Sequence, residues 1–183
     1  MRKADFGISV DVPSGWTASI VRRSLDGVPA PGTAPGARGI APEVPGAPNG
    51  LVERTLPVVH VCSRALPAGV GDFGAGALEV LGSDDVFVAL LEYGSDVAGE
   101  GLFSRQGWPR LAPSQFSPNK MFRAIPGRSA SQHFFSVGDR AFCLFTVVGA
   151  HSRRMATVPR AAQVVRSMGV EPAAVMHRRG VFV

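Results

Sequence analysis

The chain has 183 residues, of which 45% are hydrophobic and 18% are charged. A chain of this length builds one domain, residues 1–183, with a core of its own. This composition excludes a chain that stays unfolded for want of apolar side chains. The sequence contains no run of about 18 apolar residues and opens without an apolar leader, so we expect a cytoplasmic protein that inserts into no membrane.

Charge is distributed unevenly along the chain. Residues 1–100 contain 7 lysines and arginines against 12 acidic residues, a net charge of −5, whereas residues 101–183 contain 12 against 2, a net charge of +10. All but Lys3 and Lys120 of these cations are arginines. A guanidinium can fork onto carboxylate or phosphate groups and stack on aromatic rings. A GC-rich genome explains the preference for arginine over lysine equally well.

The first predicted element is an N-terminal β-hairpin. Apolar and polar residues alternate from Phe6 to Val12, which is the period of a half-buried strand. Pro13-Ser14-Gly15 predicts a turn, and residues 16–21 predict a returning strand that pairs with the first. Residues 27–50 follow with six prolines and six glycines, a composition that predicts a flexible insert.

The middle of the chain predicts two strands and one long loop. Residues 58–62 indicate a strand, residues 75–81 a short helix, and the continuously apolar residues 86–91 a central strand that is buried on both faces. Residues 94–130 are rich in glycine, proline, serine and arginine. We expect them to form a long irregular basic loop, a kind of segment that often carries function.

The clearest hairpin joins residues 133–137 to residues 140–148 through the two-residue turn Gly138-Asp139. That turn sets Phe135 opposite Phe142 and Phe134 opposite Cys143.

The last predicted element is a helix over residues 153–168. Its apolar residues recur at helical spacing, and its arginines lie mainly off that stripe. Pro159 favours a start near Thr157 or Val158, which would put the proline in the first turn. Gly169 is a candidate C-cap, and residues 171–183 are expected to form a tail.

These elements predict an α+β fold: an antiparallel, twisted sheet built from hairpins, covered by short helices in an α/β/α sandwich-like arrangement. Both ends of the chain resemble the PsbP-like α/β/α family. The resemblance lies in Pro13-Ser14-Gly15-Trp16 after a strand, in the segment from Val137 to Phe142 before an apolar strand, and in a helix that closes at Arg166-Ser167-Met168. It implies a non-enzymatic fold whose members mostly bind other proteins, and it supplies no catalytic residues.

Two other patterns suggest small ligands but have simpler explanations. Residues 69–74 spell G-x-G-x-x-G, the fingerprint of a dinucleotide-binding turn. Leu66-Pro67-Ala68 intervenes between the preceding strand and the first glycine, where a tight turn is needed. The helix that could follow is too short for a parallel crossover, so we interpret residues 69–76 as a glycine-rich turn.

His60 and Cys62 share one face of a strand, and a metal would need two further ligands. Cys143 could supply one, but His133 points to the other face of its hairpin. We therefore predict no metal and no cofactor. The two cysteines of the chain are expected to be buried free thiols, with a disulfide left open if their strands are neighbours.

The most suggestive region is residues 103–128, where rings and cations interleave. The candidate partner-binding residues are Arg105, Trp108, Arg110, Lys120, Arg123 and Arg128. We predict a non-catalytic protein-interaction module that binds an acidic protein there. Three alternatives stay open: an enzyme or small-ligand carrier that uses the turn at 69–76, a single-stranded nucleic-acid surface, and a loop that Trp108 and Phe116 merely pin to the sheet.

Overall fold

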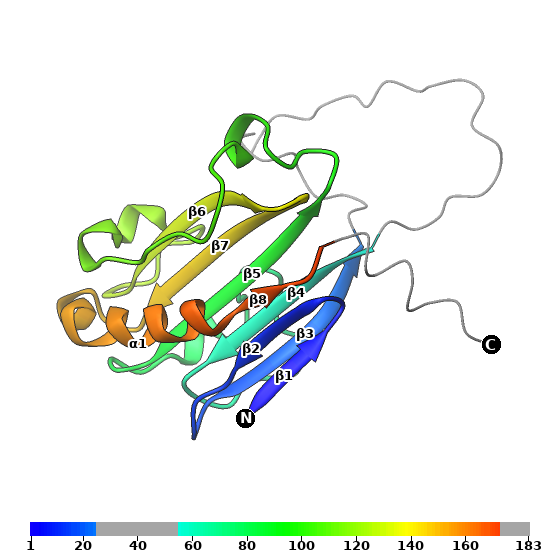
Figure 1. Cartoon of the computed structure of the whole chain (residues 1–183). Helices are drawn as coiled ribbons and strands as arrows, with labels where there is room; N and C mark the ends of the chain where they lie inside the picture. The colour runs from blue at the N-terminus through cyan, green and yellow to red at the C-terminus, as the bar shows by residue number, and fades with distance from the viewer. Residues whose placement is uncertain (25–54, 173–183) are drawn as a thin grey trace, which may run out of the picture.

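The computed structural model describes residues 1–24 and 55–172 (Figure 1). The predicted insert at 27–50 lies outside the described residues, as does all but the start of the predicted tail at 171–183. The strands and the α-helix are, in chain order, β1 (Arg2–Asp5), β2 (Ile8–Asp11), β3 (Thr17–Ser24), β4 (Thr55–Cys62), β5 (Val86–Gly94), β6 (Ser129–Val137), β7 (Arg140–Val148), α1 (Arg154–Ser167) and β8 (Gly169–Val170).

The strands form two antiparallel sheets. The larger sheet has the order β3-β4-β5-β7-β6, and the smaller has the order β1-β2-β8. Figure 1 shows α1 and the smaller sheet lying over the same face of the larger sheet. Irregular segments around Leu78 and Ile125 cover the opposite face. The α+β fold and its antiparallel sheet are confirmed, while the only α-helix within residues 1–24 and 55–172 lies on one face.

Strand β5 holds the centre of the larger sheet, as its uniform hydrophobicity predicts. Every residue from Val86 to Leu91 has an exposed fraction of 0%. Val88 and Leu90 face α1, whereas Phe87, Ala89 and Leu91 face the opposite side. A strand that is apolar on both faces needs a cover on each face, and this requirement fixes the three-layer cross-section of the domain.

The β6–β7 hairpin has the predicted register. Phe135 pairs with Phe142 and Phe134 pairs with Cys143 around the two-residue turn. Cys62 and Cys143 are both buried and free. They belong to β4 and β7, which are not neighbours because β5 lies between them. The two cysteines therefore do not form the disulfide that neighbouring strands would have allowed.

The predicted N-terminal hairpin is wrong. Strand β2 pairs with β1 and β8, whereas β3 pairs with β4. The actual hairpin is β1–β2, with Phe6 and Gly7 in its turn at φ values of 49° and 69°. Alternating hydrophobicity identifies a strand but not its partner, and here the partner β8 comes from the far end of the chain. The turn after β2 carries the chain from one sheet to the other.

The predicted helix exists but begins earlier than Pro159 suggested. Helix α1 starts at Arg154, so the proline lies inside it although an interior proline costs about 3 kcal/mol. Burial of the helix's apolar face offsets that cost, since Val158, Ala161, Val164 and Val165 are at most 2% exposed.

Two smaller local predictions also need correction. Gly169 is not a left-handed cap; it begins β8, and a Cβ at this position would lie 2.9 Å from Ser9 Oγ. The predicted helix at 75–81 is reduced to a 3₁₀ turn, Leu78–Val80. No helix in the described ranges has the length and hydrophobicity needed to cross a membrane.

Candidate functional site

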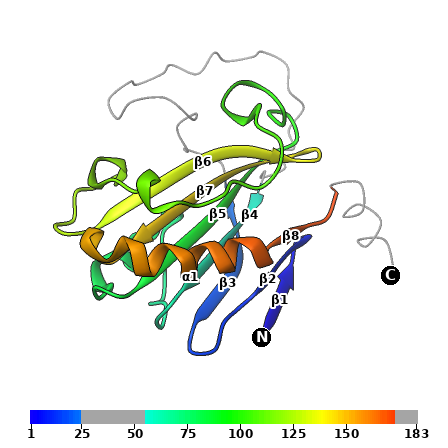
Figure 2. The same cartoon turned by 60° about the vertical axis from the view of Figure 1, so that its left-hand side comes forward.

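A groove with mixed apolar and basic walls lies between the basic loop and helix α1. Its volume is about 450 Å³, and its lining consists of Trp108, Pro109, Arg110, Leu111, Ala162, Val165 and Arg166. Figure 2 shows the loop passing between β6 and α1 on its way to the short helical turns before β6. The groove therefore joins two elements more than 50 residues apart in the chain, and we call it the Trp108 groove.

The floor of the Trp108 groove is apolar and fixed by the core. Ala162 is 9% exposed and Val165 is 2% exposed, and both project from the buried face of α1. Trp108 and Leu111 are half-buried and pack against the same core cluster. These four side chains form an apolar surface that a ligand reaches without any rearrangement of the core.

Two arginines flank this apolar floor. Arg110 comes from the loop and Arg166 from the last turn of α1, and both are exposed. Neither guanidinium has a hydrogen-bond or ion-pair partner among residues 1–24 and 55–172, unlike most arginines of the described chain. Two unpaired guanidiniums beside an apolar hollow favour an anionic ligand that also carries an apolar group.

The loop is held in place by the edge of the sheet. Gly107 N donates to the Ser136 carbonyl at 2.8 Å, and Ser136 N donates to the Arg105 carbonyl at 2.8 Å. These bonds let the segment run beside β6 like a short extra strand. Gly107 takes a φ of 84°, which only glycine adopts without strain, and this bend turns the following Trp108 toward the core.

Trp108 and Phe116 do anchor the loop, as one of the open alternatives proposed. The Trp108 and Phe135 ring centroids are 5.4 Å apart at an interplanar angle of 49°, and Phe116 is 3% exposed. The anchoring and binding interpretations are compatible, because Phe116 is buried in the core whereas part of the Trp108 ring is exposed in the groove.

Of the six predicted binding residues, only Trp108 and Arg110 line the groove. Arg123 and Arg128 lie over the opposite face of the sheet, where Arg123 Nη2 donates to Glu79 Oε1 at 2.7 Å. Arg128 Nη2 donates to the Leu81 carbonyl at 2.7 Å. These two cations hold the 3₁₀ turn Leu78–Val80 against the loop and are already occupied.

Arg105 and Lys120 are exposed and lie outside the groove lining. Lys120 Nζ donates to the Gln115 carbonyl at 2.9 Å. Both cations act on His133, whose pKa is lowered first by burial and then by the nearby charges of Lys120 and Arg105. They extend the positive surface along the loop without contributing to the hollow itself.

Sequence reasoning missed Arg166 and Leu111 as site residues. Arg166 lies just off the buried stripe of α1, four residues after Ala162 in the sequence, so helical spacing places both on one side. No local signal shows that the loop around Trp108 packs beside that side of the helix. The contact depends on the order of the strands, which the sequence does not reveal.

The glycine-rich turn at 69–76 is explained by packing. Strands β4 and β5, on either side of it, pair antiparallel, whereas a dinucleotide-binding turn joins parallel strands through a helix. A Cβ at Gly74 would lie 2.6 Å from Phe87 Cε1, so this glycine lets the turn close over a buried ring. A cavity of about 460 Å³ lies beside the turn, lined in part by His60 and Val70.

His60, Cys62 and Cys143 are packed core residues. His60 is 2% exposed, and its Nε2 lies 2.9 Å from the Asp72 carbonyl oxygen. Burial lowers the pKa of His60 and raises the pKa of Cys143 to about 12. In the described ranges, no three side chains of the His, Cys, Asp or Glu type gather as a metal site would require.

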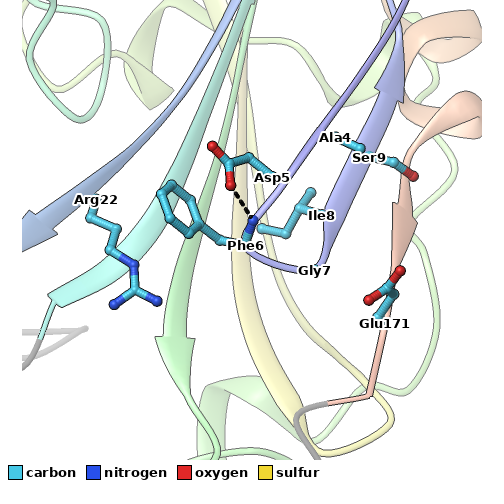
Figure 3. A pocket seen from close by; sticks show the side chains of 8 residues that line it. All are labelled: Ala4, Asp5, Phe6, Gly7, Ile8, Ser9, Arg22 and Glu171. Atoms are coloured by element: carbon cyan, nitrogen blue, oxygen red, sulfur yellow. Dashed lines mark hydrogen bonds between the residues drawn. The ribbon is translucent and has the colours of Figure 1, made fainter. Parts of the chain in front are cut away.

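A further hollow of about 390 Å³ opens at the turn of the β1–β2 hairpin. Figure 3 shows Arg22 beside the Phe6 ring on one side and Glu171 on the other. The Arg22 guanidinium carbon lies 4.7 Å from the ring centroid. Because the two carboxylates of Asp5 and Glu171 outnumber the guanidinium of Arg22, this hollow does not favour an anionic ligand.

Comparison of the chain with protein-family models, with curated proteins and with solved structures finds no match. A fold alone does not determine a function, so the residues of the Trp108 groove carry the functional proposal.

Proposed function

We propose that the protein is a non-catalytic interaction module that binds an acidic partner protein at the Trp108 groove. The observation that carries this proposal is the pair Arg110 and Arg166 on either wall of one apolar hollow. Both side chains are exposed, and neither has a polar partner among residues 1–24 and 55–172. Interfaces concentrate their binding energy in tryptophan and arginine side chains that surround a dry apolar centre. The groove presents that combination on a preformed surface.

Charge distribution supports the same assignment. The half of the chain that builds both walls of the groove has a net charge of +10. Such a surface steers an acidic partner toward the groove, and the resulting association slows as salt concentration rises. The arginines that are occupied within the molecule, such as Arg123, lie elsewhere, so the two groove arginines remain for a partner.

A PsbP-like relationship remains part of this proposal, although the described residues place an α-helix on only one face of the larger sheet. It is supported by the resemblance of the two chain ends, and it implies protein binding without catalysis. A cytoplasmic location is also part of the proposal, and the buried free thiols of Cys62 and Cys143 support it, since reducing compartments keep thiols free.

The proposal is tested by quantitative affinity capture from the lysate of the protein's own host. The wild-type protein is compared with the double variant Arg110→Ala/Arg166→Ala, which removes both groove charges. A matched control, Arg2→Ala/Arg123→Ala, removes the same charge from exposed ion pairs outside the groove. We expect the partner to be lost from the groove variant and retained by the control.

Two outcomes would contradict the proposal. Equal capture by all three proteins would remove the groove from the binding surface. Equal loss from the groove variant and the control would show a general charge effect without a site. Nuclease treatment before capture identifies nucleic-acid binding, because a partner held by nucleic acid would then be lost from every protein.

Small-ligand binding at the cavity beside the glycine-rich turn is the second candidate function. One observation favours it: the cavity is comparable in volume to the Trp108 groove and borders the buried His60. Native mass spectrometry of the protein purified from its host tests it, since a retained small molecule would add a defined mass to the chain.

A further inference from the structure

We infer that the Trp108 groove receives the C-terminal residue of its partner, with the apolar side chain on the groove floor and the free carboxylate between Arg110 and Arg166. This inference rests on the proposed function and narrows it to one kind of ligand. It follows from the size of the groove, the position of its charges and the chemistry of the guanidinium group.

The size of the groove limits what can enter. Its volume of about 450 Å³ falls within the range of about 300 to about 1,000 Å³ that small-ligand sites occupy. A partner helix would instead need a long channel for anchors on successive turns. The groove is bounded by four loop residues and three helix residues, so it encloses a single side chain and the groups next to it.

The lining specifies the chemistry of that side chain and its neighbour. Ala162 and Val165 form a buried floor without polar atoms, and Trp108 and Leu111 complete an apolar enclosure. Arg110 and Arg166 line the same hollow, so the ligand that fits it best presents an apolar group and an anionic group close together. A C-terminal residue does so, because its side chain and its α-carboxylate share one Cα.

An internal Asp or Glu fits the groove less well. Its own side chain is the anion, so the apolar group must come from a neighbouring residue that an extended chain points to the other side. A carboxylate at the chain end has no following residue to accommodate, and its two oxygens match the planar fork of an arginine. Complementary charge and a shared Cα therefore both favour a chain end.

The test uses tryptophan fluorescence of the full-length protein. The chain has two tryptophans. Trp16 does not line the groove, and its ring centroid lies 5.3 Å from the guanidinium carbon of Arg160, so Trp16→Phe leaves Trp108 as the only tryptophan reporter. The probes are the peptides N-acetyl-Gly-Ser-Gly-Ser-Leu and N-acetyl-Gly-Ser-Gly-Ser-Phe. Each is prepared as the free acid and as the C-terminal amide, which differ only in the carboxylate.

We expect the free acids to change Trp108 fluorescence saturably and the amides to bind at least about tenfold more weakly, as loss of one charge-assisted contact implies. Adding Arg166→Ala to the reporter protein should remove most of that difference, whereas adding Arg123→Ala should leave it unchanged. Equal binding of acid and amide, or no saturable change with any probe, would overturn the assignment.

The two proposals fail separately. If the acids show no advantage while partner capture still depends on Arg110 and Arg166, the groove binds an acidic segment other than a chain end. If capture is also insensitive to both arginines, the site itself is wrong.

Discussion

Arginine side chains have two different roles in two regions of this molecule. Arg140, at the start of β7, is 1% exposed, and every donor of its guanidinium is used. The groove arginines Arg110 and Arg166 are exposed and unpaired within the described chain. The same side chain is therefore a structural centre in one place and an open binding group in the other, and the number of occupied donors distinguishes the two roles.

Arg140 links three parts of the fold that are far apart in the sequence. Its Nε donates to Glu92 Oε1 at 2.9 Å, and its Nη2 contacts Glu92 Oε2. The remaining donors reach backbone carbonyls of Phe6, Gly7 and Glu171, at 3.2, 3.1 and 3.0 Å. The guanidinium thus ties the β1–β2 turn and the end of β8 to the centre of the larger sheet.

The largest effect is expected from Arg140→Ala. It leaves the Glu92 carboxylate buried without its partner, which costs about 3–5 kcal/mol, and it also frees three carbonyls of the smaller sheet. Urea unfolding should show a fall of that size in the free energy of unfolding. A loss below about 1 kcal/mol would mean that the buried pair of Arg140 and Glu92 behaves like a surface pair. It would contradict the structural role assigned to Arg140. If this variant does not fold, Arg140→Lys, which keeps the charge but loses the fork, should fold with reduced stability.

Two glycines of the glycine-rich turn allow a matched comparison of stability, and the difference between them is the second largest effect expected. Gly74 and Gly76 have nearly equal φ values of 89° and 88°, so alanine costs about the same backbone strain at both. Only at Gly74 would the new methyl also meet the Phe87 ring, which adds about 1–3 kcal/mol. Gly74→Ala should therefore be less stable than Gly76→Ala. Equal stability would reject packing as the reason for Gly74.

Stability should also decline as the solution becomes acidic. Burial lowers the pKa of His60 and His133 in the folded protein, so below about pH 6.5 the unfolded chain binds protons that the folded chain resists. That difference favours unfolding as pH falls. Urea unfolding at pH 8 and pH 5 should show a smaller decline in His60→Gln than in the wild type. An equal decline would show that His60 is not the source.

The smallest effect on stability is expected at the groove. Arg110→Ala and Arg166→Ala should each change the free energy of unfolding by no more than about 0.5 kcal/mol, because neither side chain has a partner to lose in the described part of the chain. Urea unfolding measured beside Arg140→Ala tests this directly. A loss above about 1 kcal/mol would place these arginines with Arg140 as structural residues.

Local patterns predicted the parts of this fold that depend on neighbouring residues. The β6–β7 hairpin follows from its two-residue turn, and the burial of β5 follows from its continuous hydrophobicity. The pairing of β2 with β8 could not be predicted, because it joins the two ends of the described chain. Likewise, nothing local shows that Arg140, next to a turn, would be buried on Glu92, 48 residues away.

The candidate site was predictable to a similar extent. Trp108 and Arg110 stand out because a ring and a cation lie close together in an irregular basic segment. Arg123 and Arg128 share that pattern but turn to the opposite face of the sheet, where Glu79 and backbone carbonyls occupy them. Arg166 completes the groove from an element 56 residues further along the chain than Arg110, so only the packing of α1 beside the loop reveals it.

Site-specific photo-cross-linking in the host cell tests the central claim, that the partner binds at the Trp108 groove, most directly. A benzoylphenylalanine replaces Ser114, an exposed residue of the turn Pro113–Gln115 that contacts α1, or Ala124, an exposed residue of the segment over the opposite face. The account predicts a cross-linked partner from position 114 that is absent from position 124 and disappears when Arg110→Ala and Arg166→Ala are added. A partner cross-linked only from position 124, or one at position 114 that persists in the double variant, would contradict it.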